Sequence, residues 1–245
     1  MIELVDVSVA FGHRLVLDRV SLVVPAGARF GILGPAAGGK SVLLKVMAGL
    51  VPPTSGRLLI DGVDVTGWRE ERLAPVRARI GMLFQNYALF DFLTVGENVG
   101  FPLVQRGVAA DQRALRVEER LRAVGLGGQA ERSPSQLSGG MRKRVGIARA
   151  TIAQPELVLY DEPTAGLDPV TTSKMYDLLR ADHDRTGATA IAVSSDVAAL
   201  CAFVDQALFL YQGRAHHLGP ARALADADDP IVRQFVRGDL DGPVV

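Results

Sequence analysis

The sequence predicts an α/β protein with a largely parallel sheet, a β-rich beginning and a mainly helical insertion. Short β-rich runs separated by Gly- and Pro-containing turns fill the first third of the chain. From about residue 107 to 155, leucines recur at near-helical spacing among charged residues, and beyond that stretch strand and helix patterns alternate. Such alternation is typical of a parallel sheet, and the helical stretch is the part inserted into it.

The individual elements follow from these patterns. The expected strands are the β-rich or apolar runs at 2–6, 19–24, 29–33, 57–65, 79–84, 157–160, 189–193 and 207–211. The expected helices are at 41–50, at 110–126 and at about 171–186, where Gly187 ends the last of them. From about residue 216 the chain is polar and contains three prolines, so we expect irregular structure with one short helix near 231–236.

Composition excludes several classes of protein. With 48% apolar and 22% charged residues, the chain can bury a core and is not disordered as a whole. Its 27 basic and 27 acidic residues balance, so charge alone does not suit it to coat nucleic acid or an anionic membrane. The single cysteine, Cys201, excludes an internal disulfide. Neither a secretory signal nor an uninterrupted apolar run of about 20 residues is apparent.

A glycine-rich loop between an expected strand and an expected helix is the first candidate site. Residues 29–41, RFGILGPAAGGKS, fit the pattern G-x-x-x-x-G-K-[ST]. Backbone N–H groups of such a loop bind phosphate oxygens, its lysine neutralises β- and γ-phosphate charge, and its hydroxyl reaches Mg²⁺. The nucleotide-binding residues that this motif predicts are Gly34, Pro35, Ala36, Ala37, Gly38, Gly39, Lys40, Ser41 and Val42.

A buried strand that ends in two carboxylates supplies the second part of the site. The apolar run 157–160 is followed directly by Asp161 and Glu162. Mg²⁺ sites in nucleotide enzymes use one or two carboxylates together with phosphates, so Asp161 is an expected metal ligand. Glu162 is the expected catalytic base, which orients the water that attacks the γ-phosphate. The two motifs together predict a P-loop nucleoside triphosphatase.

The segment LSGGMRKRVGIARA at 137–150 carries a family resemblance. With the two motifs above, it resembles the signature of the ATP-binding cassette (ABC) ATPases, in which Ser-Gly-Gly opens a helix that closes on the partner subunit's nucleotide. The resemblance covers about residues 1–220 as one ABC ATPase domain. It implies a RecA-like core with an antiparallel β subdomain and a helical subdomain inserted at about 86–155. Residues 221–245 remain as a C-terminal tail, which could contact the partner subunit.

This resemblance alone assigns the remaining site residues. Phe11 lies where the family stacks an aromatic ring on adenine, and Gln85 matches the catalytic-site glutamine that senses Mg²⁺. Asp168 matches the aspartate of the loop that couples two sites, known as the D-loop. The resemblance implies ATP and Mg²⁺ as cofactors and a head-to-tail homodimer with two composite sites. The implied signature residues acting in trans are Ser138, Gly139, Gly140 and Met141, and the implied Mg²⁺ ligands are Ser41, Gln85 and Asp161.

Three segments narrow the resemblance within the ABC ATPases. The sequences at 85–103, 138–144 and 228–243 look like those of the ATPases of MCE-associated, Mla-type lipid transporters. This likeness implies ATP-driven phospholipid transport between inner and outer membranes, from the cytoplasmic face of the inner membrane. The implied partners are an integral membrane permease, an MCE-domain lipid-binding protein and a STAS-domain regulatory subunit. The apolar run 88–93 would receive a helix of the permease, or it is simply core of the helical subdomain.

Two positions depart from the family pattern. Ser195 stands where the family normally has a histidine, and a hydroxyl is shorter than an imidazole and is never cationic. In the phosphate loop, Ala36 and Ala37 replace a usual Ser-Gly pair, which would strain the loop by about 1 kcal/mol if residue 37 needs a positive φ. The expected consequence is an ATPase that binds nucleotide and dimerises but hydrolyses slowly.

Three alternative functions remain open at this point. The chain could serve a different ABC importer or exporter, or it could be a nucleotide-binding regulator whose hydrolysis is impaired by Ser195. A soluble ABC protein of chromosome maintenance, repair or translation is disfavoured. No heptad array separates the phosphate loop from the signature, and only one cassette is present. We therefore expect no nucleic acid partner.

Overall fold

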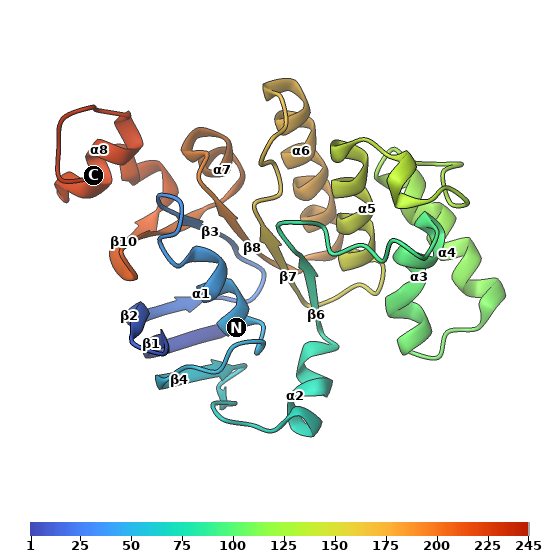
Figure 1. Ribbon diagram of the computed structural model, residues 1–245, viewed down its shortest axis with the longest axis horizontal. Coiled ribbons are helices and arrows are strands. Elements are labelled where there is room, and N and C mark those ends of the chain that lie inside the picture. The colour runs from blue at the N-terminus through green and yellow to red at the C-terminus, as the bar shows by residue number, and fades with distance from the viewer. Residues whose placement is uncertain (245) are drawn as a thin grey trace.

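The computed structural model describes residues 1–244 and arranges the strands in two sheets (Figure 1). The smaller sheet has four strands in the order β2-β1-β4-β5, and all of its pairings are antiparallel. Its strands are β1 (Ile2–Phe11), β2 (Arg14–Val24), β4 (Ser55–Ile60) and β5 (Val63–Asp64). This sheet is built from the β-rich beginning of the sequence, as expected.

The larger sheet has six strands in the order β10-β9-β3-β8-β7-β6. Neighbouring strands from β9 to β6 are parallel, and β10 is antiparallel to β9. The bounds are β3 (Arg29–Leu33), β6 (Ile80–Leu83), β7 (Leu157–Asp161), β8 (Thr189–Ser194), β9 (Gln206–Tyr211) and β10 (Arg214–Pro220). Every residue of β7 and β8 is buried, which is why both read as continuous apolar runs rather than as alternating ones.

Helices cover both faces of the larger sheet. Helix α1 (Lys40–Met47) lies between the two sheets, and its Leu43, Leu44 and Met47 belong to the core that joins them (Figure 1). Helices α6 (Pro169–Thr186) and α7 (Val197–Phe203) cover the opposite face. Gly187 ends α6 in the left-handed conformation, as its position in the sequence predicts.

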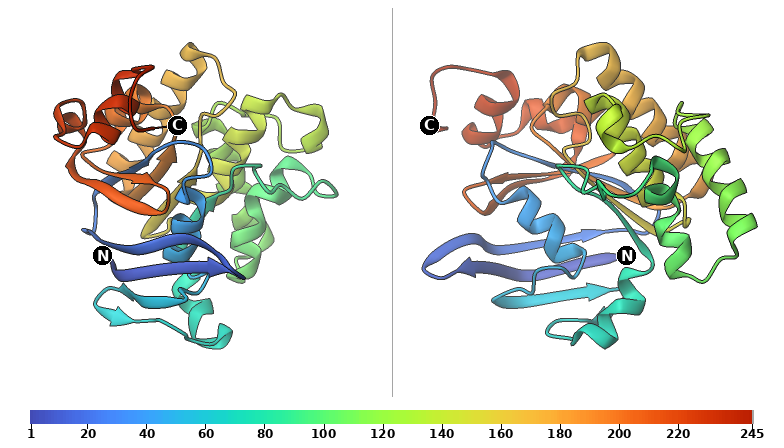
Figure 2. Two further views of the ribbon diagram at one scale, coloured as in Figure 1. Left: turned by 60° about the vertical axis from the view of Figure 1, so that its left-hand side comes forward. Right: turned by 45° about the vertical axis from the view of Figure 1, so that its right-hand side comes forward.

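The helical insertion has a hydrophobic core of its own. It comprises α3 (Val95–Gln105), α4 (Ala110–Ala123) and α5 (Gly139–Thr151), packed around residues such as Val99 and Leu121. A short helix, α2 (Glu70–Arg77), precedes it. The insertion and the C-terminal region lie at opposite ends of the molecule in every view (Figures 1 and 2).

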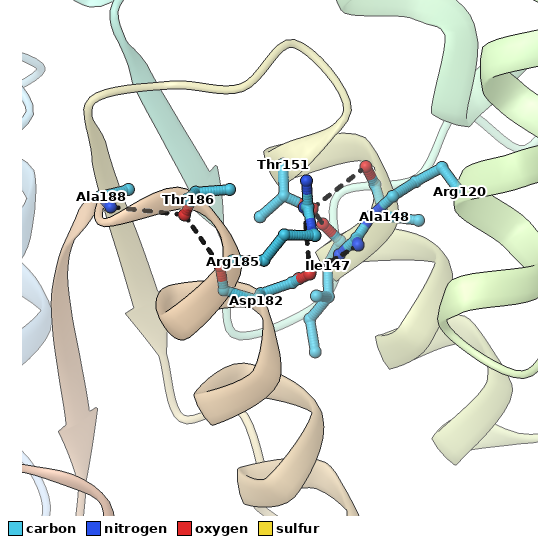
Figure 3. Close-up of polar contacts among 8 residues, drawn as sticks. All are labelled: Arg120, Ile147, Ala148, Thr151, Asp182, Arg185, Thr186 and Ala188. Atoms are coloured by element: carbon cyan, nitrogen blue, oxygen red, sulfur yellow. Dashed lines mark hydrogen bonds and ion pairs between the residues drawn. The ribbon is translucent and has the colours of Figure 1, made fainter.

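A buried ion pair joins the helical insertion to helix α6, which covers the larger sheet. Arg120 of α4 donates from Nη1 to Asp182 Oδ1 of α6 at 2.7 Å, and its Nη2 contacts the other carboxylate oxygen (Figure 3). The two side chains are only 7% and 9% exposed, and Arg185 adds a contact of 3.3 Å to the same carboxylate. Charges this deeply buried are stabilised only while they are paired.

The C-terminal region differs from the expectation. Irregular structure was predicted from about residue 216, but residues up to Pro220 form the edge strand β10. Its residues are mostly exposed or half-buried, so the sequence lacks the apolar signal of an inner strand. A 3-10 segment (Ala221–Asp226) and α8 (Pro230–Arg237) follow, and the Gln234 amide then bonds to the backbone of Asp239 and Val244. Val245 lies outside the described residues.

Within residues 1–244, none of the helices combines the length and the apolar character that spanning a bilayer requires.

Replacing Asp182 with alanine is predicted to lower the free energy of unfolding by about 3–5 kcal/mol, because Arg120 becomes an unpaired buried charge. Chemical denaturation followed by circular dichroism measures this loss. The matched control is Arg122→Ala, which breaks an exposed ion pair with Glu118 on the same helix and should cost less than about 1 kcal/mol. Equal losses in the two variants would contradict a structural role for the buried pair.

Candidate nucleotide-binding site

Three strands of the larger sheet end together and define the site. Leu33 of β3 pairs with Ser194 of β8, and Val193 of β8 pairs with Asp161 of β7. The phosphate loop therefore begins at the same edge as the two carboxylates. In open α/β sheets this edge, at the carboxyl ends of the strands, is where ligands bind.

The phosphate loop needs glycine at both of its ends. Gly34 has φ 141°, and a Cβ there would lie 2.0 Å from the carbonyl oxygen of Leu210. Gly39 has φ 98°, and a Cβ would meet Leu17 and the Val16 carbonyl at 2.9 Å. Between them, Ala37 has φ 59°, a left-handed conformation that is strained for alanine. The strain expected from the sequence at residue 37 is therefore present.

Lys40 begins α1 and its side chain folds over the loop. Its Nζ donates to the carbonyl oxygens of Gly34 and Pro35, each at 2.8 Å. The side chain is buried, and burial lowers the pKa of Lys40, whereas the negative charges of Glu162 and Asp161 oppose that fall. The loop backbone thus holds the ammonium beside the position where a phosphate chain would lie.

Ser41 and Asp161 form an oxygen pair one residue further along. The Ser41 hydroxyl donates to Asp161 Oδ1 at 2.8 Å. Burial raises the pKa of Asp161, and the Ser41 hydrogen bond and the Lys45 and Lys40 charges lower it. A hydroxyl and a carboxylate at this separation fit a hard cation such as Mg²⁺. Among residues 1–244, His, Cys, Asp and Glu side chains do not gather in groups of three or more that could hold a metal ion.

Glu162 follows Asp161 in a strained backbone conformation with φ 51°. Its N–H donates to the Val193 carbonyl at 3.0 Å, which ties this residue to the end of β8. Burial raises the pKa of the Glu162 carboxyl, while the Lys40 charge and polar groups of Ser195 lower it. Ser195 thus lies beside Glu162, at the place where the family resemblance would put an imidazole.

The signature and the Asp168 loop lie side by side in the same chain. Ser138 caps α5 and accepts from the Met141 N–H at 3.3 Å, and the hydroxyl is exposed. A Cβ on Gly140 would meet Leu167 at 3.5 Å, so this signature glycine packs against the loop. Asp168 caps α6 and accepts from the Thr171 N–H at 2.9 Å. Both motifs are therefore ordered helix starts.

Two of the expected site residues, Phe11 and Gln85, make no hydrogen bond to the phosphate loop or the carboxylates in the described chain. Phe11 is 54% exposed at the end of β1, and Gln85 is exposed two residues beyond the end of β6. Both residues lie on the surface of the protein.

Sequence reasoning missed Lys143 in the signature helix. Its side chain is 2% exposed, and its Nζ contacts the Ala165 carbonyl. Burial lowers the pKa of Lys143, whereas the negative charge of Glu162 raises it. A second buried ammonium therefore lies near the expected base. The sequence signal that could have identified it is the spacing of four residues between Lys143 and Ile147, which places both on the same buried face of α5.

An apolar groove of about 520 Å³ lies between the insertion and the end of β6. Its walls include Phe84, Phe90, Phe101 and Met82, and Arg106 and Arg149 border it. The rings of Phe90 and Phe101 pack with centroids 4.9 Å apart. Nearby, Phe92 is 83% exposed. The run 88–93 thus divides: Leu89 packs against the core of the helical insertion, Ala88 and Phe90 line the groove, and Phe92 is mostly exposed.

Comparisons with known proteins agree with this geometry. The "ABC transporter" family profile matches residues 17–165. The whole chain is 39% identical to the intermembrane phospholipid transport system ATP-binding protein MlaF of Escherichia coli, covering 91% of it, and 41% identical to protein TRIGALACTOSYLDIACYLGLYCEROL 3 of Arabidopsis thaliana, covering 75%. Over 90% of the chain it is 41% identical to the methionine import ATP-binding protein MetN 2 of Rhodococcus jostii, covering 65% of that protein.

A solved structure gives the same result. The chain resembles the dimeric ATP-binding cassette MJ0796 bound to ADP and phosphate, with a TM-score of 0.84 and 31% identity over 91% of this chain and 99% of that one. The α/β P-loop fold expected from the sequence is confirmed. The chain belongs to the ABC transporter family, as an MlaF-like ATP-binding subunit that hydrolyses ATP.

Proposed function

We propose that this protein is the ATPase subunit of a transporter that moves phospholipid between an inner and an outer membrane. The observation that carries the proposal is the 39% identity to MlaF, which extends over the whole chain, tail included. A second candidate is the ATPase of another importer, because a relative named for methionine import is 41% identical over a shorter span.

The proposed reaction is attack of water on the γ-phosphate of ATP. The loop 34–39 and the start of α1 bind the phosphates through backbone N–H groups, and Lys40 neutralises their charge. Glu162 accepts a hydrogen bond from the attacking water and orients it in line with the bond that breaks. Phe11 stacks on adenine, and Gln85 approaches the γ-phosphate from the end of β6.

Mg²⁺ is the proposed cofactor, with Ser41, Asp161 and Gln85 as its protein-side partners. It would neutralise charge that develops on the transferred phosphoryl group. The Ser41–Asp161 hydrogen bond of 2.8 Å supports this assignment, because it holds the hydroxyl and the carboxylate next to each other. Asp161 is buried beside Lys40 and Lys45, so the protein part of the site keeps its charge balanced.

The proposed working form is a head-to-tail homodimer. In it, Ser138, Gly139, Gly140 and Met141 of one copy close on the nucleotide of the other, and Asp168 couples the two sites. The dimeric structure of MJ0796 and the exposure of Ser138 support this arrangement. The N–H groups at the start of α5 are suited to a γ-phosphate.

We also propose partner proteins, a location and a division of the chain into a cassette and a tail. An integral permease would seat a helix in the apolar groove beside Phe90 and Phe101, where the exposed Phe92 adds contact area. We also propose an MCE-domain protein, a STAS-domain regulator and a position at the cytoplasmic face of the inner membrane. Residues 1–220 would form the cassette, with its helical part at about 86–155. Residues 221–245 would form the tail, with Val245 outside the described residues.

Isolation of the native membrane complex tests the proposed transport. A tag on this chain should recover an integral permease together with phospholipid, identified by mass spectrometry of the solvent extract. Recovery with an amino-acid importer and no phospholipid would contradict the proposal in favour of the second candidate. The control is the same preparation from cells that express the untagged chain.

Replacing Ser195 with histidine is predicted to raise steady-state ATP turnover of the purified complex by about tenfold or more. The reason is that an imidazole next to Glu162 can contact the γ-phosphate and help position the water. Turnover is measured by phosphate release per assembled complex. The control is Glu162→Gln, which should stop turnover while ATP stays bound in a closed dimer. No gain with histidine would contradict the slow-hydrolysis hypothesis.

Replacing Ala37 with glycine is predicted to stabilise the protein by about 1 kcal/mol, because residue 37 has φ 59° and glycine adopts such angles without strain. Ala36 has no positive φ, so Ala36→Gly should instead destabilise through added freedom of the unfolded chain. Denaturant titration of the two variants measures the difference. A loss of stability in both would show that the loop is unstrained.

A further inference from the structure

Tyr176 is a buried phenol that the proposed reaction does not use. It lies in α6, in the helix that Asp168 begins, and only 3% of it is exposed. Its ring packs against Phe203 of α7 with centroids 5.5 Å apart, which fixes the direction of the hydroxyl. Within residues 1–244 that hydroxyl makes no hydrogen bond of normal length, although the Thr164 and Ser194 hydroxyls lie near enough to affect its pKa.

The hydroxyl faces the two turns that carry the expected catalytic positions. Thr164 lies in the turn after Glu162, Ser194 ends β8, and both of their hydroxyls lower the pKa of Tyr176. Burial is the largest influence and raises that pKa, and the carboxylates of Asp196 and Glu162 also raise it, so that the net value is about 12. The phenol is therefore neutral at physiological pH and can donate a hydrogen bond toward either turn.

These neighbours are themselves buried parts of the site. Thr164 is 4% exposed and Ser194 is 1% exposed. The Ser194 hydroxyl accepts from the Asp196 N–H at 3.0 Å, so it shapes the turn that presents Ser195. The Glu162 N–H bonds to the Val193 carbonyl at 3.0 Å, which joins the two turns directly. A change in the hydroxyl cluster would thus move both turns.

A buried hydroxyl without a partner is costly, and phenylalanine would pack in its place without that cost. Hydrogen bonds of active sites are often poorly aligned without substrate and tighten when it binds. We propose that Tyr176 is a positioning residue, which donates to the Thr164–Ser194 hydroxyl pair when the nucleotide site closes and so holds the Glu162 and Ser195 turns in place.

This inference rests on the proposed role of Glu162 as the base. The phenol acts through the two turns and touches neither nucleotide nor water. Its removal should therefore slow hydrolysis without weakening the binding of ATP. Ser195 is too short to hold the turn by contacting the phosphate, as a histidine could. The buried hydroxyls of Tyr176, Thr164 and Ser194 would hold the turn instead.

Tyr176→Phe in the full chain tests the proposal. We expect kcat for ATP to fall about tenfold with KM unchanged within twofold, and the thermal midpoint to stay the same or rise. Ser194→Ala should lower kcat similarly, and the double variant should be no slower than the slower single one, because both act through one contact. Tyr160→Phe is the matched control. It removes another buried phenol, which neighbours the Arg120–Asp182 pair, and should leave kcat unchanged.

Three results would overturn the inference. They are an unchanged kcat in Tyr176→Phe, a fall in kcat that only parallels a fall in thermal midpoint, or fully multiplicative effects of the two substitutions. Glu162→Gln separates this failure from failure of the proposed reaction. If Glu162→Gln abolishes turnover but Tyr176→Phe does not lower it, the role of Glu162 as the base is supported and the positioning role of Tyr176 is wrong. If Glu162→Gln keeps turnover, the proposed reaction itself is wrong.

Discussion

The placing of one buried ammonium, Lys40, beside two carboxylates at the edge of the larger sheet constrains the rest of the structure. Lys40 and Asp161 are buried and Glu162 is half-buried, and an isolated buried ion costs several kcal/mol. The Lys40 charge stabilises both carboxylates, which repel each other, and it lies close to them only because β3, β8 and β7 end in register. The strand order and the glycine-lined turn after Leu33 follow from that need, because they bring the ammonium over the loop toward the carboxylates.

A second buried ion pair sets where the signature lies. Arg120 joins α4 to Asp182 in α6, and α6 begins at Asp168, beside the signature glycines. Helix α5 runs from the signature toward β7, whose last residue is Asp161. The insertion therefore contacts the rest of the protein through helices α4 and α6 as well as through its connecting loops. The same helix α6 also carries Tyr176, so one element links the insertion, the Asp168 loop and the turn of Glu162.

Local motifs made most of the fold and much of the site predictable. The strand before the loop, the helix after it and the buried strand ending at Asp161 each have a short-range signature, and the structure contains all three. Edge strand β10 was missed because its polar, half-exposed residues carry no periodic signal. Lys143 and Tyr176 were missed for a different reason. Their burial depends on contacts with Ala165 and Phe203, which are brought near by folding and cannot be read from neighbouring residues.

One chain contains two helix starts suited to a phosphate, and they do not complete each other. Lys40 at the start of α1 is held by its own loop carbonyls, whereas the start of α5 at Ser138 is open to solvent. Among residues 1–244, no hydrogen bond joins signature residues 138–141 to the phosphate loop. Exposed N–H groups at a helix start attract anions, so the arrangement favours a second copy that brings its α5 to this nucleotide.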